Sequence, residues 1–163
     1  MSELDDAMAG TRAAVDEIIH TAATSPATWT RPRAPGKWSP SQVVEHVARA
    51  LEASADDIAG RPSNLPNLPR PLRFVARSFL FNRVVRGKPF PRARTNRAMD
   101  PAAGPATPAD GADRLEAAWA ALAAACAAAP SAEMTSKTFG PVRLPDYLRF
   151  QESHTRHHQK QMS

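Results

Sequence analysis

The chain has 163 residues, enough for one domain with a substantial core, and 42% of them are hydrophobic although only 6% are aromatic. Alanine supplies much of the hydrophobic fraction, which favours closely packed helices over sheets. No apolar stretch is long enough to span a membrane, the acidic N-terminus lacks the order of a signal peptide, and a lone cysteine excludes an internal disulfide, so a cytoplasmic protein is expected. Most of the net charge of +5 lies between Arg61 and Arg97, where no acidic residue occurs.

The first two predicted helices cover about residues 3–23 and about residues 39–59. Three start signals coincide at the beginning of the second helix. Ser39 is a suitable cap, Pro40 occupies the first helical position, and Gln42 completes a capping box. Apolar residues recur with helical spacing along both segments, which predicts that each buries one face.

A crossover dense in proline and arginine follows, from about residue 61 to about residue 106. One stretch within it, Leu72–Val85, contains no proline and is predicted to form a short amphipathic helix. The plainer interpretation of the arginines in this insertion is that they are solvated. Contact of the stretch with a membrane surface or a nucleic acid stays open as an alternative.

The last two helices are expected over about residues 108–129 and about residues 144–162. Thr107, Pro108 and Asp110 repeat the pattern of cap, proline and acid at the start of the third helix. Four such helices with one long connection predict an all-α fold, an antiparallel four-helix bundle whose crossover contains a short extra helix. The whole chain, residues 1–163, is expected to form a single domain.

The inward face of the last helix is polar. At 100° per residue, this face carries Tyr147, Gln151, His154, His158 and Gln161. Buried polar groups need partners, and one metal ion satisfies several imidazoles together. Histidines at the solvated end of a helix are the plainer alternative, because cations are favoured there.

His46 lies at the border of the apolar arc of the second helix, within reach of a site between the second and fourth helices. Taken alone, it is more simply read as a hydrogen-bonded or half-exposed histidine. Together with His154 and His158 it would complete a three-histidine site with one coordination position open. His157 falls nearer the edge of the inward face, so it is not among the predicted ligands.

Two sequence blocks carry a resemblance to a known family. The first covers residues 36–47 (GKWSPSQVVEHV), and the second comprises residues 139–141 (FGP), 147–150 (YLRF) and 154–161 (HTRHHQKQ). In order and separation they resemble the DinB/YfiT-like superfamily of four-helix metal-binding proteins. The resemblance implies a divalent metal, zinc or nickel above all, bound by His46, His154 and His158.

The resemblance also implies a range of functions. Family members of known activity are mostly metal-dependent thiol transferases, so the expectation is a metal-dependent thiol S-transferase that joins a low-molecular-weight thiol to a small electrophile. A metal-dependent hydrolase and a non-catalytic metal-binding stress-response module stay open as alternatives. Partners are then a small-molecule substrate and a thiol, without nucleic acid, and a homodimer is a further expectation, to which the segment Phe74–Phe81 could contribute.

Residues beside the predicted ligands are candidates for orienting an imidazole or the substrate. These are Glu45, next to His46, and Tyr147, Gln151 and Gln161 on the fourth helix. Glu45 is also the available general base for hydrolysis. Arginines of the insertion are candidates for holding the carboxylates of a thiol. Cys126 lies on the apolar seam of the third helix and is interpreted as a buried structural thiol.

Overall fold

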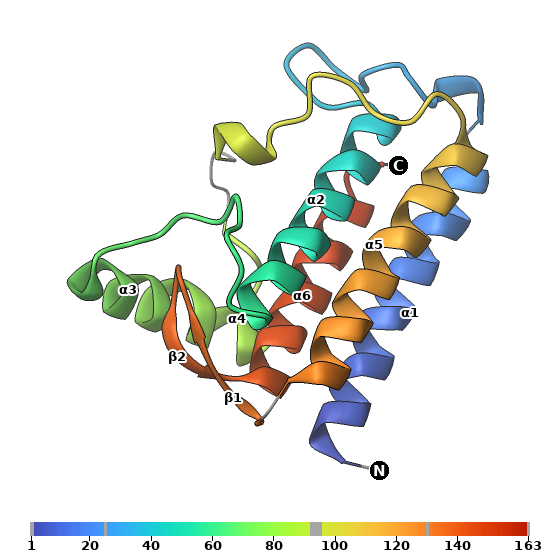
Figure 1. The fold of residues 1–163 in the computed structure, drawn as a ribbon. Helices are drawn as coiled ribbons and strands as arrows, with labels where there is room; N and C mark the ends of the chain where they lie inside the picture. Colours follow the sequence, from blue (N-terminus) through green and yellow to red (C-terminus); the bar gives the residue numbers. More distant parts are fainter. Residues whose placement is uncertain (1, 25, 92–95, 130, 163) are drawn as a thin grey trace.

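Four long helices form the body of the structure (Figure 1). The computed structural model describes residues 2–24, 26–91, 96–129 and 131–162, so residues 92–95 of the predicted insertion lie outside the described residues. The helices are α1 (Glu3–Ala23), α2 (Pro40–Ile58), α5 (Pro108–Ala128) and α6 (Leu144–Gln159). The all-α fold is confirmed. The last helix ends at Gln159, three residues earlier than expected.

Capping boxes begin three of these helices. The hydroxyl of Ser39 accepts a hydrogen bond from the backbone N–H of Gln42, and the Gln42 side chain accepts one from the Ser39 N–H. Thr107 and Asp110 form the same reciprocal pair at the start of α5. Both pairs were predicted, and a third box opens α1 at Ser2. Each cap satisfies backbone N–H groups that have no partner within the helix, which fixes where the helix begins.

The directions of the helices correct one detail of the expected bundle. Figure 1 shows α1 and α6 running one way and α2 and α5 running the other. The antiparallel neighbours are therefore α1 with α5 and α2 with α6, whereas α2 and α5 pack side by side in parallel, as do α1 and α6. The reason is the long crossover, which returns the chain to the end of the bundle where α2 began.

The crossover contains a projecting segment, residues 70–85, called the arm below. The arm comprises α3 (Arg70–Ala76), a π-helical turn (Arg77–Phe81) and α4 (Asn82–Val85), and it matches the extra helix predicted over Leu72–Val85. Its outer end extends away from the bundle (Figure 1). Two single-turn 3-10 helices occupy other connections, at Pro26–Thr28 and Arg97–Met99.

A β-hairpin precedes α6 and was not predicted from the sequence. Its strands are β1 (Glu133–Ser136) and β2 (Gly140–Arg143), paired antiparallel from Glu133 opposite Arg143 to Ser136 opposite Gly140. Four residues per strand are too few for a clear alternating pattern. Gly140 has φ +72°, a left-handed conformation that glycine adopts without strain, at the end of the hairpin turn.

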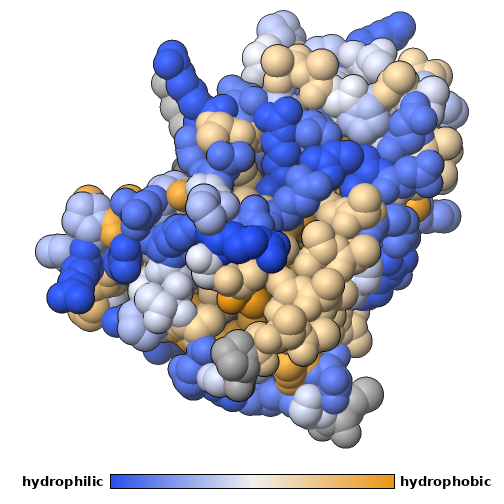
Figure 2. Space-filling model, viewed as in Figure 1, coloured by the Kyte–Doolittle hydropathy of each residue, from blue (hydrophilic) through white to orange (hydrophobic). Residues whose placement is uncertain are grey.

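Two apolar clusters hold the fold together. The larger one fills the space between the four long helices and includes Val15, Leu51, Leu122 and Leu148. A second cluster joins the arm and the hairpin to α6, through Phe81, Val84, Phe139, Val142, Tyr147 and Phe150. Figure 2 shows small apolar residues over the outer face of α5, consistent with the alanine-rich sequence of that helix. In the described part of the chain, no helix is both long enough and apolar enough to cross a membrane.

A close crossing fixes the connection between the arm and α5 against the start of α2. The carbonyl oxygen of Pro105 accepts hydrogen bonds from the Ser41 hydroxyl at 2.6 Å and from the Trp29 indole N–H at 2.8 Å. A Cβ atom at the preceding Gly104 would lie 2.1 Å from the backbone oxygen of Ser41, so only glycine fits there. This contact holds residues 99–105 beside the helix that carries His46.

Candidate metal centre

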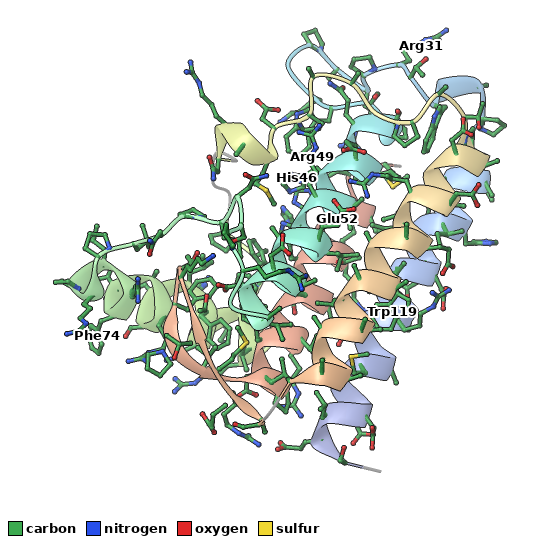
Figure 3. The ribbon with its side chains drawn as sticks, viewed as in Figure 1. Arg31, His46, Arg49, Glu52, Phe74 and Trp119 are labelled. Carbon is green, nitrogen blue, oxygen red and sulfur yellow. The ribbon has the colours of Figure 1, made fainter. Side chains whose placement is uncertain are left out.

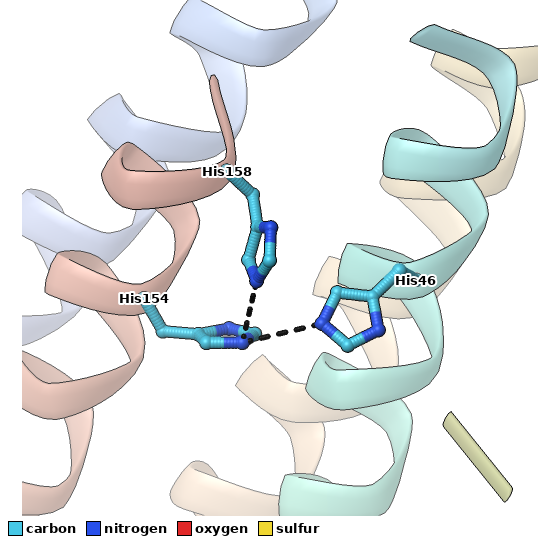
Figure 4. Close-up of side chains that lie close together, drawn as sticks. All are labelled: His46, His154 and His158. Carbon is cyan, nitrogen blue, oxygen red and sulfur yellow. Dashed lines mark hydrogen bonds between the residues drawn. The ribbon is translucent and has the colours of Figure 1, made fainter. Parts of the chain in front are cut away.

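Three histidine side chains from two helices converge inside one end of the bundle (Figure 4). His46 comes from α2, and His154 and His158 come from successive turns of α6, where residues four apart share a face. The Nε2 atom of His154 lies 3.3 Å from Nε2 of His46 and 3.1 Å from Nε2 of His158. These are the three residues that the sequence predicted as a group.

Hydrogen bonds on the far side orient two of the rings. Nδ1 of His46 lies 2.8 Å from the carbonyl oxygen of Met99, and Nδ1 of His158 lies 3.0 Å from Oε1 of Gln161. Both oxygens can only accept, so each Nδ1 carries the proton and donates it. In a neutral imidazole the other nitrogen then has a lone pair, and both Nε2 atoms present theirs to the centre of the group.

His154 stands between the other two rings. Its Nδ1 atom is buried and has no hydrogen-bond partner among the described residues. A neutral His154 has one N–H and can serve at most one of the two lone pairs that face its Nε2. The three Nε2 atoms thus have at least two lone pairs pointing inward and at most one N–H to bond them, so hydrogen bonds alone cannot satisfy the group. A single cation at the centre would accept all of these lone pairs.

Burial keeps these imidazoles neutral. Removal from water lowers the pKa of His46 below its ordinary value and that of His154 well below it, and neighbouring histidines lower the pKa of His154 further. Burial, followed by the charge of His46, lowers the pKa of His158 to about 3. Neutral imidazole is the form that binds metal, so the group is ready to bind at neutral pH without first losing protons.

The distances between these nitrogens fit a small divalent ion. Ligand nitrogens 2.0–2.1 Å from a tetrahedral zinc ion lie about 3.3–3.4 Å from one another. Two of the three separations are 3.1 and 3.3 Å, and all three ligand atoms lie within 4.8 Å of one another. Two of these separations therefore match a tetrahedral zinc site as they stand, and the third pair, His46 and His158, lies within 4.8 Å.

All three rings line a cavity of about 760 Å³. Its wall combines apolar side chains with Arg33, Lys37 and Lys160, and none of its described lining residues is an aspartate or glutamate. The cationic residues come from the loop before α2 and from the end of α6. The insertion arginines proposed from the sequence as carboxylate partners are not among the lining residues that the structure describes.

Aromatic rings enclose the histidines within this cavity. The Trp38 ring centre lies 4.7 Å from that of His46 and 5.9 Å from that of His158. Its indole N–H donates to Asp100 at 3.1 Å, which ties the loop before α2 to the segment that carries Met99. Phe90 lies 5.4 Å from His154 on another side. These rings limit access of water to the imidazoles.

Two of the four predicted orienting residues lie at the cavity. Gln161 contacts His158 as described above, and its amide nitrogen lies 3.2 Å from Nε2 of His157. Gln151 is buried one turn before His154 and lines the cavity. His157 also lines the cavity, but it is not part of the convergent group.

The other two predicted residues, Glu45 and Tyr147, do not reach the histidines. Glu45 turns towards α5, where it binds Arg114 at 3.1 Å, and it also binds Arg49 one turn along α2 at 2.8 Å. It points away from the site because consecutive residues on a helix point about 100° apart. Arg114 also binds Glu52, on the same side of α2 (Figure 3). A general base at Glu45 for hydrolysis is therefore not supported by its position.

Tyr147 shares the inward face of α6, as predicted, but seven residues separate it from His154, about 10 Å along the helix. Its hydroxyl donates to Asp57 at 3.2 Å in the second apolar cluster. Burial, reinforced by the charge of Asp57, raises the pKa of Tyr147 well above its ordinary value, so the phenol stays protonated. Its contacts indicate a structural role.

Sequence reasoning missed the contributions of Trp38, Phe90 and Met99. Trp38 directly precedes the Ser39 cap, and this position is the one signal in the sequence that its ring borders His46. Phe90 and the Met99 carbonyl come from the irregular crossover, which has no periodicity from which their position could be predicted.

Comparison with known proteins gives one match. The sequence model described as the DinB superfamily matches residues 3–162, nearly the whole chain. No curated protein and no solved structure matches. The matched range includes all three convergent histidines and the cavity around them.

Proposed function

The chain belongs to the DinB superfamily, and from that premise we propose that it is a metal-dependent thiol S-transferase. In this proposal His46, His154 and His158 hold a zinc or nickel ion. A low-molecular-weight thiol is joined to a small electrophile: the S–H bond breaks and a sulfur–carbon bond forms, while the bond from that carbon to the leaving group, or to the ring oxygen of an epoxide, breaks. The leaving group or ring oxygen takes the bonding electrons, and the proton passes to it or to solvent. The observation that carries the proposal is the convergence of three neutral Nε2 atoms on a cavity large enough for a small molecule.

A divalent ion held by three neutral ligands keeps its full charge and lowers the pKa of a thiol or water bound beside it. The residues of the chain supply orientation and enclosure. The Met99 carbonyl holds His46, and Gln161 holds His158, each with its proton on the far side of the ring. Such outer partners fix the direction of a ligand lone pair and raise its basicity.

The lining of the cavity supports a substrate that is partly apolar and partly anionic. Trp38 and Phe90 provide flat apolar surface beside the histidines. Lys37 and Lys160 are exposed at the same cavity and suit a carboxylate on the thiol or on the electrophile. The described lining of the cavity has no acidic side chain to serve as a base. A thiol is a far stronger acid than water and needs such a base less, so the cavity supports thiol transfer better than hydrolysis.

The test uses protein loaded with zinc or nickel, a panel of thiols that includes glutathione, and a small epoxide or haloarene as electrophile. Mass spectrometry measures the thioether product. We expect product to form faster than in buffer, and the excess to be lost in His154→Ala. His20→Ala is the matched control, because His20 is an exposed histidine on α1 and is not among the described residues that line the cavity.

Two other outcomes distinguish the alternatives. Consumption of an ester or amide by the loaded protein without any thiol would replace thiol transfer with metal-dependent hydrolysis. Tight metal binding together with no turnover of any thiol or ester would favour a non-catalytic metal-binding module. Size-exclusion chromatography with light scattering tests the homodimer, which is part of the proposal because family members often dimerise.

A further inference from the structure

The arm exposes apolar side chains that folding does not use. Among the described residues, every large apolar side chain that is exposed lies on this segment: Leu72, Phe74, Val75 and Phe79. Phe74 is 61% exposed and Phe79 is 75% exposed. Phe74 points away from the bundle (Figure 3). Single exposed apolar residues are common on protein surfaces, but four within eight residues are a patch that calls for an explanation.

The arm has two apolar sides rather than one. On the inner side Phe81 and Val84 are buried against the hairpin and α6. Leu72, Val75 and Phe79 follow helical spacing of three and four residues and, together with the exposed Phe74, form a separate outer stripe. A surface helix that serves only the fold needs the inner side alone. The outer stripe therefore indicates a contact that the monomer does not make.

The charge around this stripe has a single sign. Residues 61–97 contain nine arginines, one lysine and no acidic residue, a charge of +10, whereas the rest of the chain has 11 basic and 16 acidic residues, a charge of −5. Among the described residues, the one ion pair formed by this segment joins Arg61 to Asp56. Arg70 and Arg83 are exposed on the arm itself, and Arg86 is exposed directly after it. The apolar stripe thus lies within the basic part of a strongly polarised molecule.

Two of the arm's arginines secure its position and leave the stripe exposed. Arg73 donates to the Leu68 carbonyl at 2.6 Å, and Arg77 donates to the Pro141 carbonyl at 2.9 Å beside the hairpin. Because these bonds and the buried Phe81 and Val84 hold the inner side, the outer stripe is presented on a helix that is already formed. Binding then requires little ordering of the chain, which otherwise weakens association.

We propose that the arm binds the surface of membranes that contain anionic lipids. Leu72, Phe74, Val75 and Phe79 enter the boundary between headgroups and acyl chains, and Arg70, Arg83 and Arg86 contact lipid phosphates beside them. A helix with an apolar stripe and flanking arginines lies in the plane of such a surface. Anionic headgroups attract each nearby arginine, and the attraction extends only over about one Debye length.

Charge favours this partner over two others. An isologous dimer formed through the arm would set each set of arginines against its own copy, and like charges at an interface are unfavourable. A nucleic acid would neutralise the arginines but would leave the aliphatic Leu72 and Val75 without an apolar partner. An anionic membrane satisfies both the charges and the apolar stripe.

The experiment measures binding of the protein to vesicles of phosphatidylcholine alone and of phosphatidylcholine with about 30% phosphatidylglycerol, by flotation. We expect binding to the anionic vesicles, loss of it on raising the salt from about 0.1 M to about 0.5 M, and little binding to the neutral ones. Phe74→Ser/Phe79→Ser should weaken binding by about tenfold or more, because it removes the side chains that enter the bilayer. Arg83→Gln should weaken it by about fivefold.

Matched controls keep these outcomes separate from folding and from the proposed enzyme. Arg31→Gln removes an exposed arginine at the other end of the bundle (Figure 3) and should leave vesicle binding unchanged. All substituted side chains are exposed, so circular dichroism should match the wild type. Protein stripped of metal should bind vesicles as well as loaded protein, which makes the result independent of the proposed function.

The proposal is overturned if wild-type protein does not bind anionic vesicles, or if the phenylalanine variant binds them as the wild type does. A dimer that dissociates in Phe74→Ser/Phe79→Ser, without vesicle binding by the wild type, would assign the stripe to a second copy of the chain. Salt-dependent binding of short DNA that ignores the phenylalanine substitutions, again without vesicle binding, would assign the arginines to nucleic acid.

Discussion

Replacing Gln161 tests whether hydrogen bonds behind the histidines prepare them for metal. The Gln161 side chain accepts the Nδ1 proton of His158 at 3.0 Å, whereas its backbone N–H donates separately to the His158 carbonyl at 2.9 Å. Gln161→Leu therefore removes the acceptor and keeps a side chain of similar size, and the backbone bond that shapes the turn is retained. Without the acceptor, His158 is free to rotate or to carry its proton on Nε2, where it blocks metal binding.

The expected loss follows from the role of such partners. Removing an outer hydrogen bond to a metal-binding histidine weakens metal affinity by about 10–100-fold, or about 1.4–2.7 kcal/mol. We expect a loss in this range for zinc with Gln161→Leu. Gln161→Glu should bind zinc at least as tightly as the wild type, because a carboxylate is a stronger acceptor for the same proton.

The assay is competition for zinc against a chromophoric chelator at pH 7, with thermal unfolding to verify the fold. Gln159→Leu is the control on the same helix, because Gln159 donates to Thr21 at 3.0 Å and does not contact a histidine. It should lower stability by about 1 kcal/mol and leave zinc affinity unchanged. Wild-type affinity in a folded Gln161→Leu variant would show that this hydrogen bond does not prepare His158 for metal, and an equal loss in Gln159→Leu would show that the effect is not specific to it.

Three further predictions concern buried groups. The free energy of unfolding of metal-free protein, measured with urea, should decrease as the pH falls from about 6.5 towards 3. In that interval His158 is protonated in the unfolded chain but not in the folded chain, where its pKa is about 3. An equally steep dependence of the unfolding free energy on pH in His158→Gln would contradict this. Burial raises the pKa of Cys126 to about 11. An aromatic disulfide reagent should therefore modify this thiol at pH 8 far more slowly in the native protein than in urea-unfolded protein. Equal rates would show that the native thiol is accessible. Asp57→Asn should lower the free energy of thermal unfolding by about 1–3 kcal/mol, because Asp57 accepts hydrogen bonds from the Tyr147 hydroxyl and from a backbone N–H. The control Asp56→Asn should lower it by less than about 0.5 kcal/mol. Similar losses in the two variants would contradict the role given to Asp57.

Local sequence signals predicted the helices because those signals act locally. The Ser39 and Thr107 caps each operate within four residues, so the starts of α2 and α5 could be located without knowledge of the tertiary structure. The parallel packing of α2 and α5 could not be located in this way, because it depends on where a long irregular crossover returns the chain. The hairpin was missed because each of its strands has only four residues.

The candidate site was predictable to a similar extent. Helical periodicity placed His154 and His158 on one face, and the position of His46 on the apolar border of the second helix made it the third candidate, in agreement with the family resemblance. The structure brings these rings together. Helical periodicity predicts towards which side of the helix a side chain points, but it does not predict which residues of other segments lie beside it along the helix axis. For that reason Tyr147 was assigned to the site although it lies two turns away, and the partners of His46 in the crossover were not foreseen.

Metal content decides whether the three histidines form a metal site: it is measured on the purified protein after exposure to zinc or nickel and removal of unbound ion. We expect about one ion per chain, lost in His46→Ala and in His154→Ala/His158→Ala and retained in His20→Ala. A folded wild-type protein that takes up neither metal would contradict this expectation, and so would variants that hold as much metal as the wild type.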